Sequence, residues 1–420
     1  MKNYKIRDDL WERIRSKMDE IKIVDTHEHL GRAFPIFTIS KKYNMNLITF
    51  LAHSYLYGDL ISSGMKMIPP EKMSWQQLKP FLENVKNSIY FRYLLRALKD
   101  FYGLKEDNIN DNNWKAISYL ISKKTENHIQ WSLEVLDLMN IHRMILDISK
   151  GCIVNTEMIN DDRLVQVVKM DDFIMGGLNI VKKFTNNSVD KLDDYLEVLD
   201  MAFEIAKMNK VIGVKCAIGY NRIISFDSIE KSEAQKIFSN GIRNVSLADR
   251  KKFQDYMMHI VCERSIKHDL PIQVHTGLQA GNFNDITNAK PTHLTNLFKK
   301  YKKARFVLFH GSYPYIQEAG VLAKYFPNVY LDACWLSHIS PSSYRRGLDE
   351  WLDIVPSNKI FAWGGDHEII EHSYASLMLA KDLITDVLVN KIISGDSSEK
   401  IAISLMEKIL HGNSINFYGL

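Results

Sequence analysis

Ile23–Leu30 reads IVDTHEHL, an apolar run near the N-terminus that ends in a His-x-His pair. Successive side chains of an extended strand point to opposite faces, so His27 and His29 lie on one face and can bind one metal ion. His-x-His also occurs by chance, and two partly exposed histidines at the end of a strand would read the same way. If the pair is half of a metal site, the other ligands lie far along the chain, at the ends of other strands.

Short apolar runs of this kind recur along the chain. The predicted strands are residues 21–25, 143–148, 164–169, 211–217, 271–275, 305–310, 329–333 and 360–366. Most are apolar throughout, as expected for parallel strands covered on both faces, and stretches with helical spacing such as 192–208 and 249–268 separate them. The sequence therefore predicts an α/β fold, a distorted (β/α)8 TIM barrel, whose active site lies at the carboxyl ends of the strands.

Length, charge and cysteine usage narrow the class of protein. The 420 residues suit one barrel with insertions, and the 54 basic and 50 acidic residues nearly cancel without long runs of one sign. We therefore expect a small-molecule substrate, with neither nucleic acid nor membrane as a partner. The scattered cysteines, the lack of an apolar leader and the lack of a spanning segment predict a soluble cytoplasmic protein. The sequence leaves a homo-oligomer open.

One connection is far longer than a barrel loop needs. Residues 31–140 separate the first two predicted strands, whereas such loops usually take roughly two to six residues. The segments 88–102 and 113–121 carry apolar residues at helical spacing. We predict that 31–140 is a helical insertion within a single barrel domain of residues 1–420. It could supply substrate contacts or a lid, or it could be a cap used for oligomer contacts.

Three more polar residues end predicted strands. His275 ends the run PIQVH, His310 ends FVLFH, and Asp366 ends IFAWGGD. A single histidine at such a place is more often a hydrogen-bonded structural residue, but five polar side chains on one rim are hard to attribute to packing. Neutral imidazoles with a carboxylate suit zinc, or manganese or iron if more oxygen ligands join.

Such a set of residues has a clear chemistry. A metal ion bound there lowers the pKa of its water towards about 7 and polarises a substrate carbonyl. Asp366 could both touch the metal and accept the proton from its water. His310 could orient the attacking water or stabilise charge on the substrate oxygen. Asp366 and His310 are therefore the predicted catalytic residues.

In this order along the chain, the residues resemble the amidohydrolase superfamily, most closely its amidohydrolase-related branch. The resemblance spans nearly the whole chain and implies that a divalent metal, usually zinc, is bound by His27, His29, His275 and Asp366. It also implies that His310 is catalytic or binds a second ion. Stretches 310–315, 327–332, 340–342 and 411–413 are similar to FluG-type members of this branch, which is also the branch of aminocarboxymuconate-semialdehyde decarboxylase. The long helical insertion resembles that of uronate isomerases.

The fourth predicted strand carries a lysine, Lys215. In two-metal members of the superfamily a lysine at this strand is carboxylated and bridges the ions, so Lys215 could be that bridge. The alternative is a free ammonium within a Lys-x4-Tyr-x-Arg arrangement similar to that of FluG-type proteins. Lys215, Tyr220 and Arg222 would then bind a substrate carboxylate, which arginine can hold bidentately. We favour one ion and this substrate-binding role.

We therefore predict a metal-dependent hydrolase whose activated water attacks an amide, ester or cyclic C–N bond of a small carboxylate-bearing molecule. The superfamily also contains nonoxidative decarboxylases and uronate isomerases, so both reactions are alternatives. A non-catalytic barrel that only binds a ligand is a further alternative. His367 and His372 are five residues apart, whereas the histidines of the zinc-protease motif are four apart, so we discard that motif.

Overall fold

Nine short strands form the centre of the computed structural model, which describes residues 2–32, 34, 36–38, 45–149 and 152–420. They are β1 (Ile23–Glu28), β2 (Ile141–Leu146), β3 (Leu164–Gln166), β4 (Val168–Lys169), β5 (Val214–Cys216), β6 (Ile272–Val274), β7 (Phe306–Leu308), β8 (Val329–Asp332) and β9 (Ile360–Phe361). The strands pair in chain order, β1 to β3 in one sheet and β4 to β9 in a second, and every ladder is parallel.

Backbone hydrogen bonds join the two sheets at both of their edges. Only Val167 lies between β3 and β4, and its N–H donates to Leu146 O at 3.1 Å, so the two strands continue one another. At the other edge, the N–H of Asp366 donates to His27 O at 2.8 Å, and the N–H of His29 donates to His367 O at 2.9 Å. The chain therefore forms the predicted α/β barrel, distorted at these two seams.

The strands are mostly shorter than the apolar runs that predicted them. Of the predicted strand 360–366, only Ile360 and Phe361 keep ladder pairing. A Cβ on Gly364 would lie 2.5 Å from Thr26 Oγ1, and one on Gly365 would lie 1.8 Å from Glu28 Oε1, so the chain passes too close to β1 for side chains here. In contrast, β1 continues three residues past its predicted end, which places His27 inside the strand.

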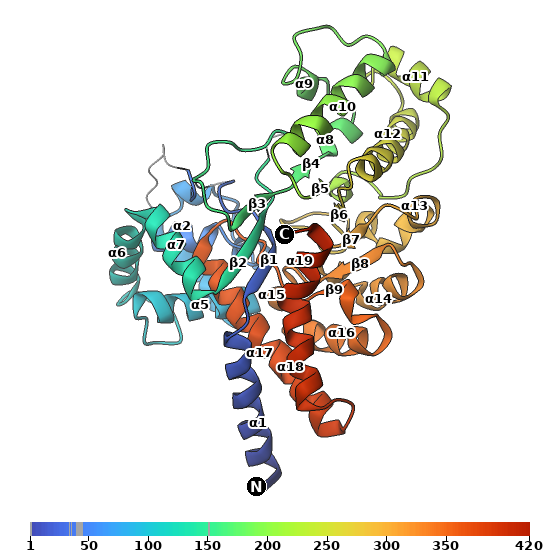
Figure 1. Cartoon of the computed structure of the whole chain (residues 1–420). Helices are drawn as coiled ribbons and strands as arrows, with labels where there is room; N and C mark the ends of the chain where they lie inside the picture. The colour runs from blue at the N-terminus through green and yellow to red at the C-terminus, as the bar shows by residue number, and fades with distance from the viewer. Residues whose placement is uncertain (1, 33, 35, 39–44, 150–151) are drawn as a thin grey trace.

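One helix precedes the first strand, and further helices follow the strands as predicted. They are α1 (Lys2–Asp19), α8 (Asp171–Ile174), α9 (Leu178–Val181), α10 (Leu192–Met208), α11 (Lys231–Ser239), α12 (Leu247–Lys267), α13 (Thr295–Lys300), α14 (Ile316–Tyr325), α15 (Leu336–Ile339), α16 (Pro341–Ile354), α17 (Ile370–Ser394), α18 (Glu399–Glu407) and α19 (Asn413–Tyr418). Helices α8 to α12 form a lobe beyond β4 and β5 (Figure 1). None of the helices in the described parts of the chain is both long and apolar enough to cross a membrane.

Another set of helices lies between β1 and β2, within the predicted insertion (Figure 1). They are α2 (Leu47–Ala52), α3 (Leu56–Ser62), α4 (Trp75–Val85), α5 (Ile89–Tyr102), α6 (Trp114–Thr125) and α7 (His128–Leu138). The predicted helices 88–102 and 113–121 correspond to α5 and α6. Helix α5 begins after Ser88, whose hydroxyl accepts the N–H of Phe91, and ends at Gly103 in the left-handed region. Residues 33, 35 and 39–44 of the predicted insertion lie outside the described residues.

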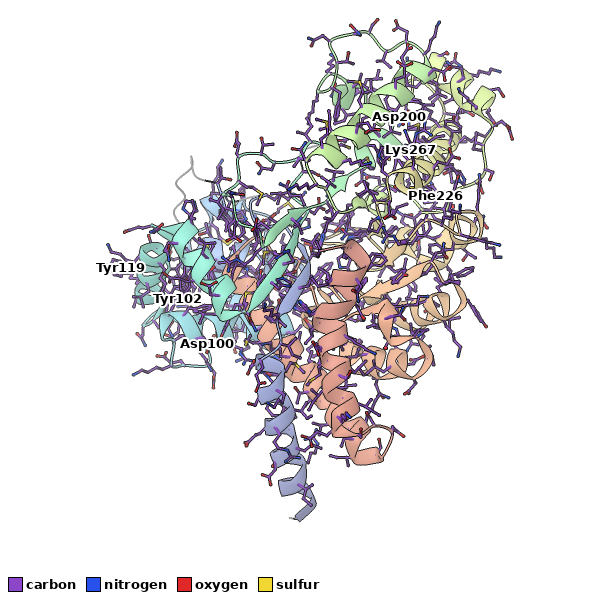
Figure 2. All side chains as sticks on the ribbon, viewed as in Figure 1. Asp100, Tyr102, Tyr119, Asp200, Phe226 and Lys267 are labelled. Atoms are coloured by element: carbon purple, nitrogen blue, oxygen red, sulfur yellow. The ribbon has the colours of Figure 1, made fainter. Side chains whose placement is uncertain are left out.

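The inserted helices share a hydrophobic core of their own. Buried side chains of α2 to α6 pack against Ile369 and Ala375, at the beginning of α17. The Tyr102 hydroxyl and the Trp131 indole both donate to Glu371 Oε1, at 2.5 and 2.9 Å. On the outer side, Tyr119 of α6 points into solvent (Figure 2). Contact with α17 therefore holds the inserted helices against the barrel.

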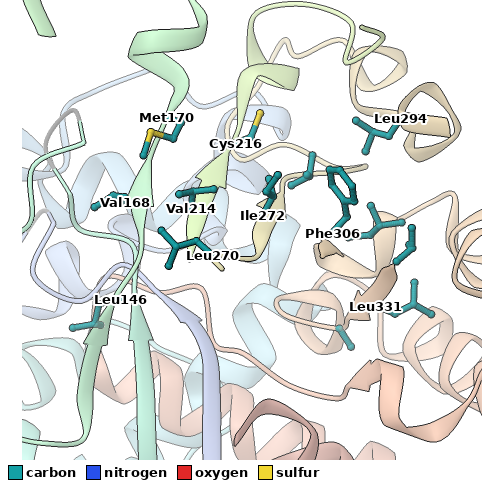
Figure 3. Close-up of a cluster of buried hydrophobic side chains, with 14 of the residues drawn as sticks. Leu146, Val168, Met170, Val214, Cys216, Leu270, Ile272, Leu294, Phe306 and Leu331 are labelled. Atoms are coloured by element: carbon teal, nitrogen blue, oxygen red, sulfur yellow. The ribbon is translucent and has the colours of Figure 1, made fainter. Parts of the chain in front are cut away.

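Strand side chains alternate between the surrounding helices and the barrel interior. Val168, Val214, Ile272 and Phe306 are paired in register and belong to the main apolar cluster outside the strands (Figure 3). The next positions in register, including Lys215, Gln273 and Val307, point the other way.

The amino end of the barrel is closed by α19. Its residues Phe417 and Tyr418 pack with Val307 and Phe361 of the interior, and Gln273 Nε2 donates to the Tyr418 hydroxyl at 3.0 Å. These side chains fill the amino end of the barrel, whereas the carboxyl ends of the strands are left open.

Gly277 offers a test of the packing behind His275. Its φ is +77°, and an added Cβ would lie 2.2 Å from the backbone oxygen of Tyr313. Gly395, which ends α17 at φ +87°, has nothing within 4 Å of that position. We expect Gly395→Ala to lower the free energy of unfolding by about 1 kcal/mol, through backbone strain alone, and Gly277→Ala to lower it by about 3 kcal/mol or more. Urea unfolding measures both values, and equal losses would contradict the packing described.

Candidate metal centre at the barrel mouth

Two histidines and an aspartate meet at the seam between β1 and the loop after β9. Oδ1 of Asp366 lies 3.5 Å from Nε2 of His27 and 3.1 Å from Nε2 of His29. One ligand atom from each residue fits within a group no wider than 4.8 Å. His27 and Asp366 are buried, and His29 is partly exposed. Two imidazoles and a carboxylate at this spacing could hold one divalent metal ion.

Hydrogen bonding and burial keep these imidazoles ready to bind a metal. Nδ1 of His29 donates to the backbone oxygen of Asp147 at 2.8 Å, so Nε2 carries the lone pair and faces Asp366. Burial, with the nearby charge of Lys215, lowers the pKa of His27 well below its usual value, so this ring is neutral. Burial acts to raise the pKa of Asp366, but its contacts with His29, His310 and His27 hold that pKa well below the usual range.

His275 is oriented away from this cluster. Its Nε2 lies 2.8 Å from Leu278 O, and its Nδ1 lies 2.9 Å from Nε2 of His310. A carbonyl can only accept, so Nε2 of His275 carries the proton and its Nδ1 accepts from His310. Both nitrogens of His275 are thereby engaged. The resemblance implied His275 as a metal ligand, but the structure does not bring it into the group of His27, His29 and Asp366.

The hydrogen bond with His275 also determines which ring nitrogen of His310 carries the proton. Its Nε2–H is given to His275, and burial lowers its pKa to about 3, so Nδ1 bears a lone pair. That lone pair faces Asp366 Oδ2 at 3.8 Å and Cys334 O at 3.3 Å. Three acceptors facing one another repel unless a cation or a proton lies among them. This arrangement fits a metal ion bound beside Asp366.

Cys334 forms a second group of possible ligands with His310 and Asp366. Burial and the charges of Asp366 and Asp332 raise the pKa of the Cys334 thiol well above its usual value. Metals bind the thiolate rather than the thiol. The group with two β1 histidines is therefore the better metal site.

Two buried carboxyl groups hold the seam that carries the ligands. Asp25 Oδ1 accepts the N–H groups of His27 and Gly365, both at 3.1 Å. Glu28 Oε2 accepts the N–H of His367 at 2.5 Å. Burial raises the pKa of Asp25 to about 7 and that of Glu28 well above its usual value. These carboxyl groups fix where β1 and the loop after β9 present their ligands, although they contact no ligand atom themselves.

A cavity of about 680 Å³ opens in front of the cluster. Residues at the ends of several strands line it: His27, His29, Asp147, Lys169, Asp171, Lys215, His275 and Asp366. The inserted helices supply another wall, where Tyr55 donates its hydroxyl to Asp366 O at 2.6 Å and stacks on Trp335 with ring centroids 4.2 Å apart. Asp147 is the last residue but one of the predicted strand 143–148, and Asp171 lies two residues beyond the predicted strand 164–169, so the strand-end rule could have found them. Nothing in the sequence pointed to Tyr55.

The predicted substrate-binding residues are only partly brought together. Lys215 lines the cavity, 2% exposed, and its Nζ lies 3.5 Å from the centroid of the Phe309 ring. Tyr220 also lines the cavity, with its hydroxyl accepting the N–H of Ala280 at 2.8 Å.

Arg222, predicted to bind substrate, does not line the cavity. A 3-10 turn, η2 (Ile218–Tyr220), redirects the chain, so the Arg222 guanidinium pairs with Asp255 Oδ1 at 2.7 Å and donates to Ser225 O at 2.6 Å. It is committed to holding the loop after β5, and the structure corrects the predicted arrangement at this position.

Comparisons with known proteins agree with this fold. Residues 248–420 match the family model described as Amidohydrolase. Protein fluG of Emericella nidulans is 30% identical over 227 residues, which cover 50% of this chain and 26% of that protein. The chain therefore spans about a quarter of the length of this curated relative.

Solved structures match over almost the full chain. A uronate isomerase from Thermotoga maritima gives a TM-score of 0.83 at 13% identity, covering 98% of this chain and 97% of its own. A protein described as a metal-dependent hydrolase, from Lactobacillus casei, gives 0.68 at 18% identity, covering 96% of each chain. The fold is thus that of TIM barrels of this kind. Residues 248–420 are thus similar to the Amidohydrolase family, and the chain as a whole shares its fold with these two solved structures.

Asp332 allows a test of whether a buried carboxyl near the ligand cluster is protonated in the folded chain. Its Oδ1 accepts Thr26 Oγ1 and the N–H of Cys334, and burial raises its pKa to about 7. Between the two pKa values the Asp332 carboxyl is protonated in the folded chain and ionised in the unfolded chain. Its contribution to the free energy of unfolding is therefore full below pH 4 and is lost as the pH rises to about 7.

Asp332→Asn does not titrate and keeps the Oδ1 acceptor. In chain treated with chelator, its stability relative to the natural chain should therefore improve from pH 5 to pH 7 by up to about 1.4 kcal/mol for each pH unit. Urea unfolding at several pH values measures this difference. Asp396→Asn, on an exposed turn, is the control and should show a constant difference. A flat profile for Asp332→Asn would show that Asp332 is ionised in the folded chain.

Proposed function

We propose that the chain is a metal-dependent hydrolase that acts on an amide, ester or cyclic C–N bond of a small carboxylate-bearing molecule. The observation that carries the proposal is the convergence of His27, His29 and Asp366 at the mouth of a barrel, facing a cavity of about 680 Å³. The Lactobacillus casei neighbour is described as a metal-dependent hydrolase, which agrees with it. In this proposal the chain works as one barrel domain, with residues 31–140 as an insertion that walls the site.

His27, His29 and Asp366 would hold one divalent ion, which we propose to be zinc because two imidazoles and one carboxylate are its usual catalytic ligands. Bound there, the ion would act as a Lewis acid towards a carbonyl and towards water. Lys215 argues for one ion rather than two. Its Nζ lies over the face of Phe309, the position of an ammonium rather than of a carbamate that needs hydrogen-bond donors.

Asp366 and His310 would handle the proton. Asp366 Oδ2 faces Nδ1 of His310 at 3.8 Å, so a water between them would be held by two acceptors. Asp366 would accept the proton of the attacking water and return it to the leaving group. With Nδ1 unprotonated, His310 can orient that water but cannot donate to an oxyanion, so only the first of its two predicted roles fits the geometry.

Lys215 would stabilise the negative charge that develops on the substrate oxygen. Its Nζ is buried and has no hydrogen-bond partner among the described residues. Burial lowers its pKa to about 8, so most of it is charged at neutral pH. A buried ammonium without a partner is costly, and a substrate oxyanion or carboxylate would relieve that cost.

The second candidate function is isomerisation of a sugar acid. It is favoured by the likeness to a uronate isomerase along 98% of the chain, including the inserted helices that bring Tyr55 to Asp366. Release of a carboxylic acid from N-acyl amino acids would support the hydrolase. Interconversion of a hexuronate with its keto form, without hydrolysis, would support the isomerase.

Metal content gives the first test of the proposal. Purified without chelator or affinity metal, the natural chain should hold about one ion, and His29→Asn and Asp366→Asn should hold far less because each loses a ligand. Elemental analysis per chain measures this. The control is His142→Asn. His142 lies near the amino end of β2, where it contacts His411, so this variant should retain the ion. Two ions per chain, or an Asp366→Asn chain that binds metal normally, would contradict the proposed site.

A further inference from the structure

Arg32 stands in the same cavity as the ligand cluster, only three residues beyond His29. Its backbone N–H donates to His29 O at 2.9 Å, which ties the start of its loop to the end of β1. Its side chain lines the cavity and is exposed, whereas Lys215 on the floor is 2% exposed. The two cations therefore lie at different depths of one pocket.

No carboxylate pairs with Arg32 in the parts of the chain that the structure describes. The other basic groups near the mouth are already engaged: Lys169 pairs with Asp147 Oδ2 at 3.2 Å, and His53 Nε2 contacts Glu71 Oε1 at 3.0 Å. Arg222, the arginine favoured by the sequence, is committed to Asp255. Arg32 is thus a guanidinium that faces the pocket with its donors available.

Tyr220 indicates where the charge of Arg32 acts. Burial raises the pKa of Tyr220 above its usual value, the negative charge of Asp366 adds to that rise, and the positive charge of Arg32 opposes it. Since Tyr220 and Asp366 also line the cavity, Arg32 faces the space through which a substrate would approach the ligand cluster.

We propose that Arg32 binds a carboxylate of the substrate, at the end remote from the bond that is broken. The inference rests on the proposed hydrolase function and names its substrate class: a small acid whose carboxylate is joined by a short chain to the reacting amide. The amide would lie deep, beside Asp366 and Lys215, and the carboxylate nearer the mouth. A guanidinium can hold both carboxylate oxygens through parallel hydrogen bonds, which gives orientation as well as affinity.

The test compares two probes that differ only at that end, 4-acetamidobutanoate and its carboxamide. Isothermal titration calorimetry on the full chain, loaded with zinc, gives the two dissociation constants. We expect the acid to bind about tenfold to a hundredfold more tightly than the carboxamide. Arg32→Met should remove this preference by weakening the acid alone. Arg32→Lys should keep part of it, because it retains the charge without the planar fork.

Arg13→Met is the matched control. It removes the same charge from the exposed surface of α1, where Arg13 pairs with Glu399, so it should leave both dissociation constants unchanged. Equal affinities of the natural chain for the two probes, no binding of either, or a preference that survives in Arg32→Met would each overturn the role of Arg32.

The release of acetate from the acid probe is measured in parallel and separates this inference from the proposed function. A preference that depends on Arg32, without acetate release, would keep Arg32 as the carboxylate site and reject hydrolysis of this bond. Acetate release that Arg32→Met leaves unchanged in kcat and KM would keep the hydrolase and reject Arg32.

Discussion

The two backbone hydrogen bonds between the end of β1 and the loop after β9 are the constraint on which the site depends. Asp366 N–H to His27 O and His29 N–H to His367 O close the ring of strands, and the bonded residues include all three ligands of the candidate centre. A displacement of either segment would therefore both open the barrel and separate the ligands. The hydrogen bonds that close the barrel also position the candidate ligands. Among the described strands, β1 and β9 form no ladder that would hold the seam without these bonds.

Holding the seam together costs free energy, because it buries two acidic side chains. Asp25 and Glu28 are fully buried acids that accept backbone N–H groups of the neighbouring loop, and such groups are tolerated in an interior only when they are hydrogen-bonded or protonated. Gly365 has to be a glycine, because a Cβ would coincide with the Glu28 carboxyl. The local sequence THEH at one side of the seam and GGDH at the other therefore combines ligands with the residues that hold them. Asp25 and Glu28 have the second role, because they accept backbone N–H groups at the seam.

The difference between local and long-range contacts explains which parts of the fold and site could be predicted from the sequence. Strand runs and strand-end positions are local properties, so the barrel order and the meeting of His27, His29 and Asp366 followed from the sequence. The role of His275 could not, because its ring is oriented by a carbonyl at Leu278 and by the tautomer of His310, neither of which leaves a pattern in the sequence. The placement of Arg222 outside the cavity could not be foreseen either, because it depends on a 3-10 turn after β5 and on the ion pair with Asp255. Tyr55 lies in a long connection, where no periodicity relates a residue to the barrel axis.

The site thus has two parts with different mechanical properties. Its floor is made of side chains at strand ends, each locked by burial or by a backbone hydrogen bond, which is the fixed geometry that the proposed reaction would need. Its wall comes from helices with their own core, which meet the barrel through α17 and through the hydrogen bond of Tyr55 to Asp366 O. That bond is to the backbone of the very residue that carries the ligand carboxylate. A shift of the inserted helices on substrate binding would therefore be transmitted to Asp366, so the insertion can influence the chemistry without contributing a metal ligand.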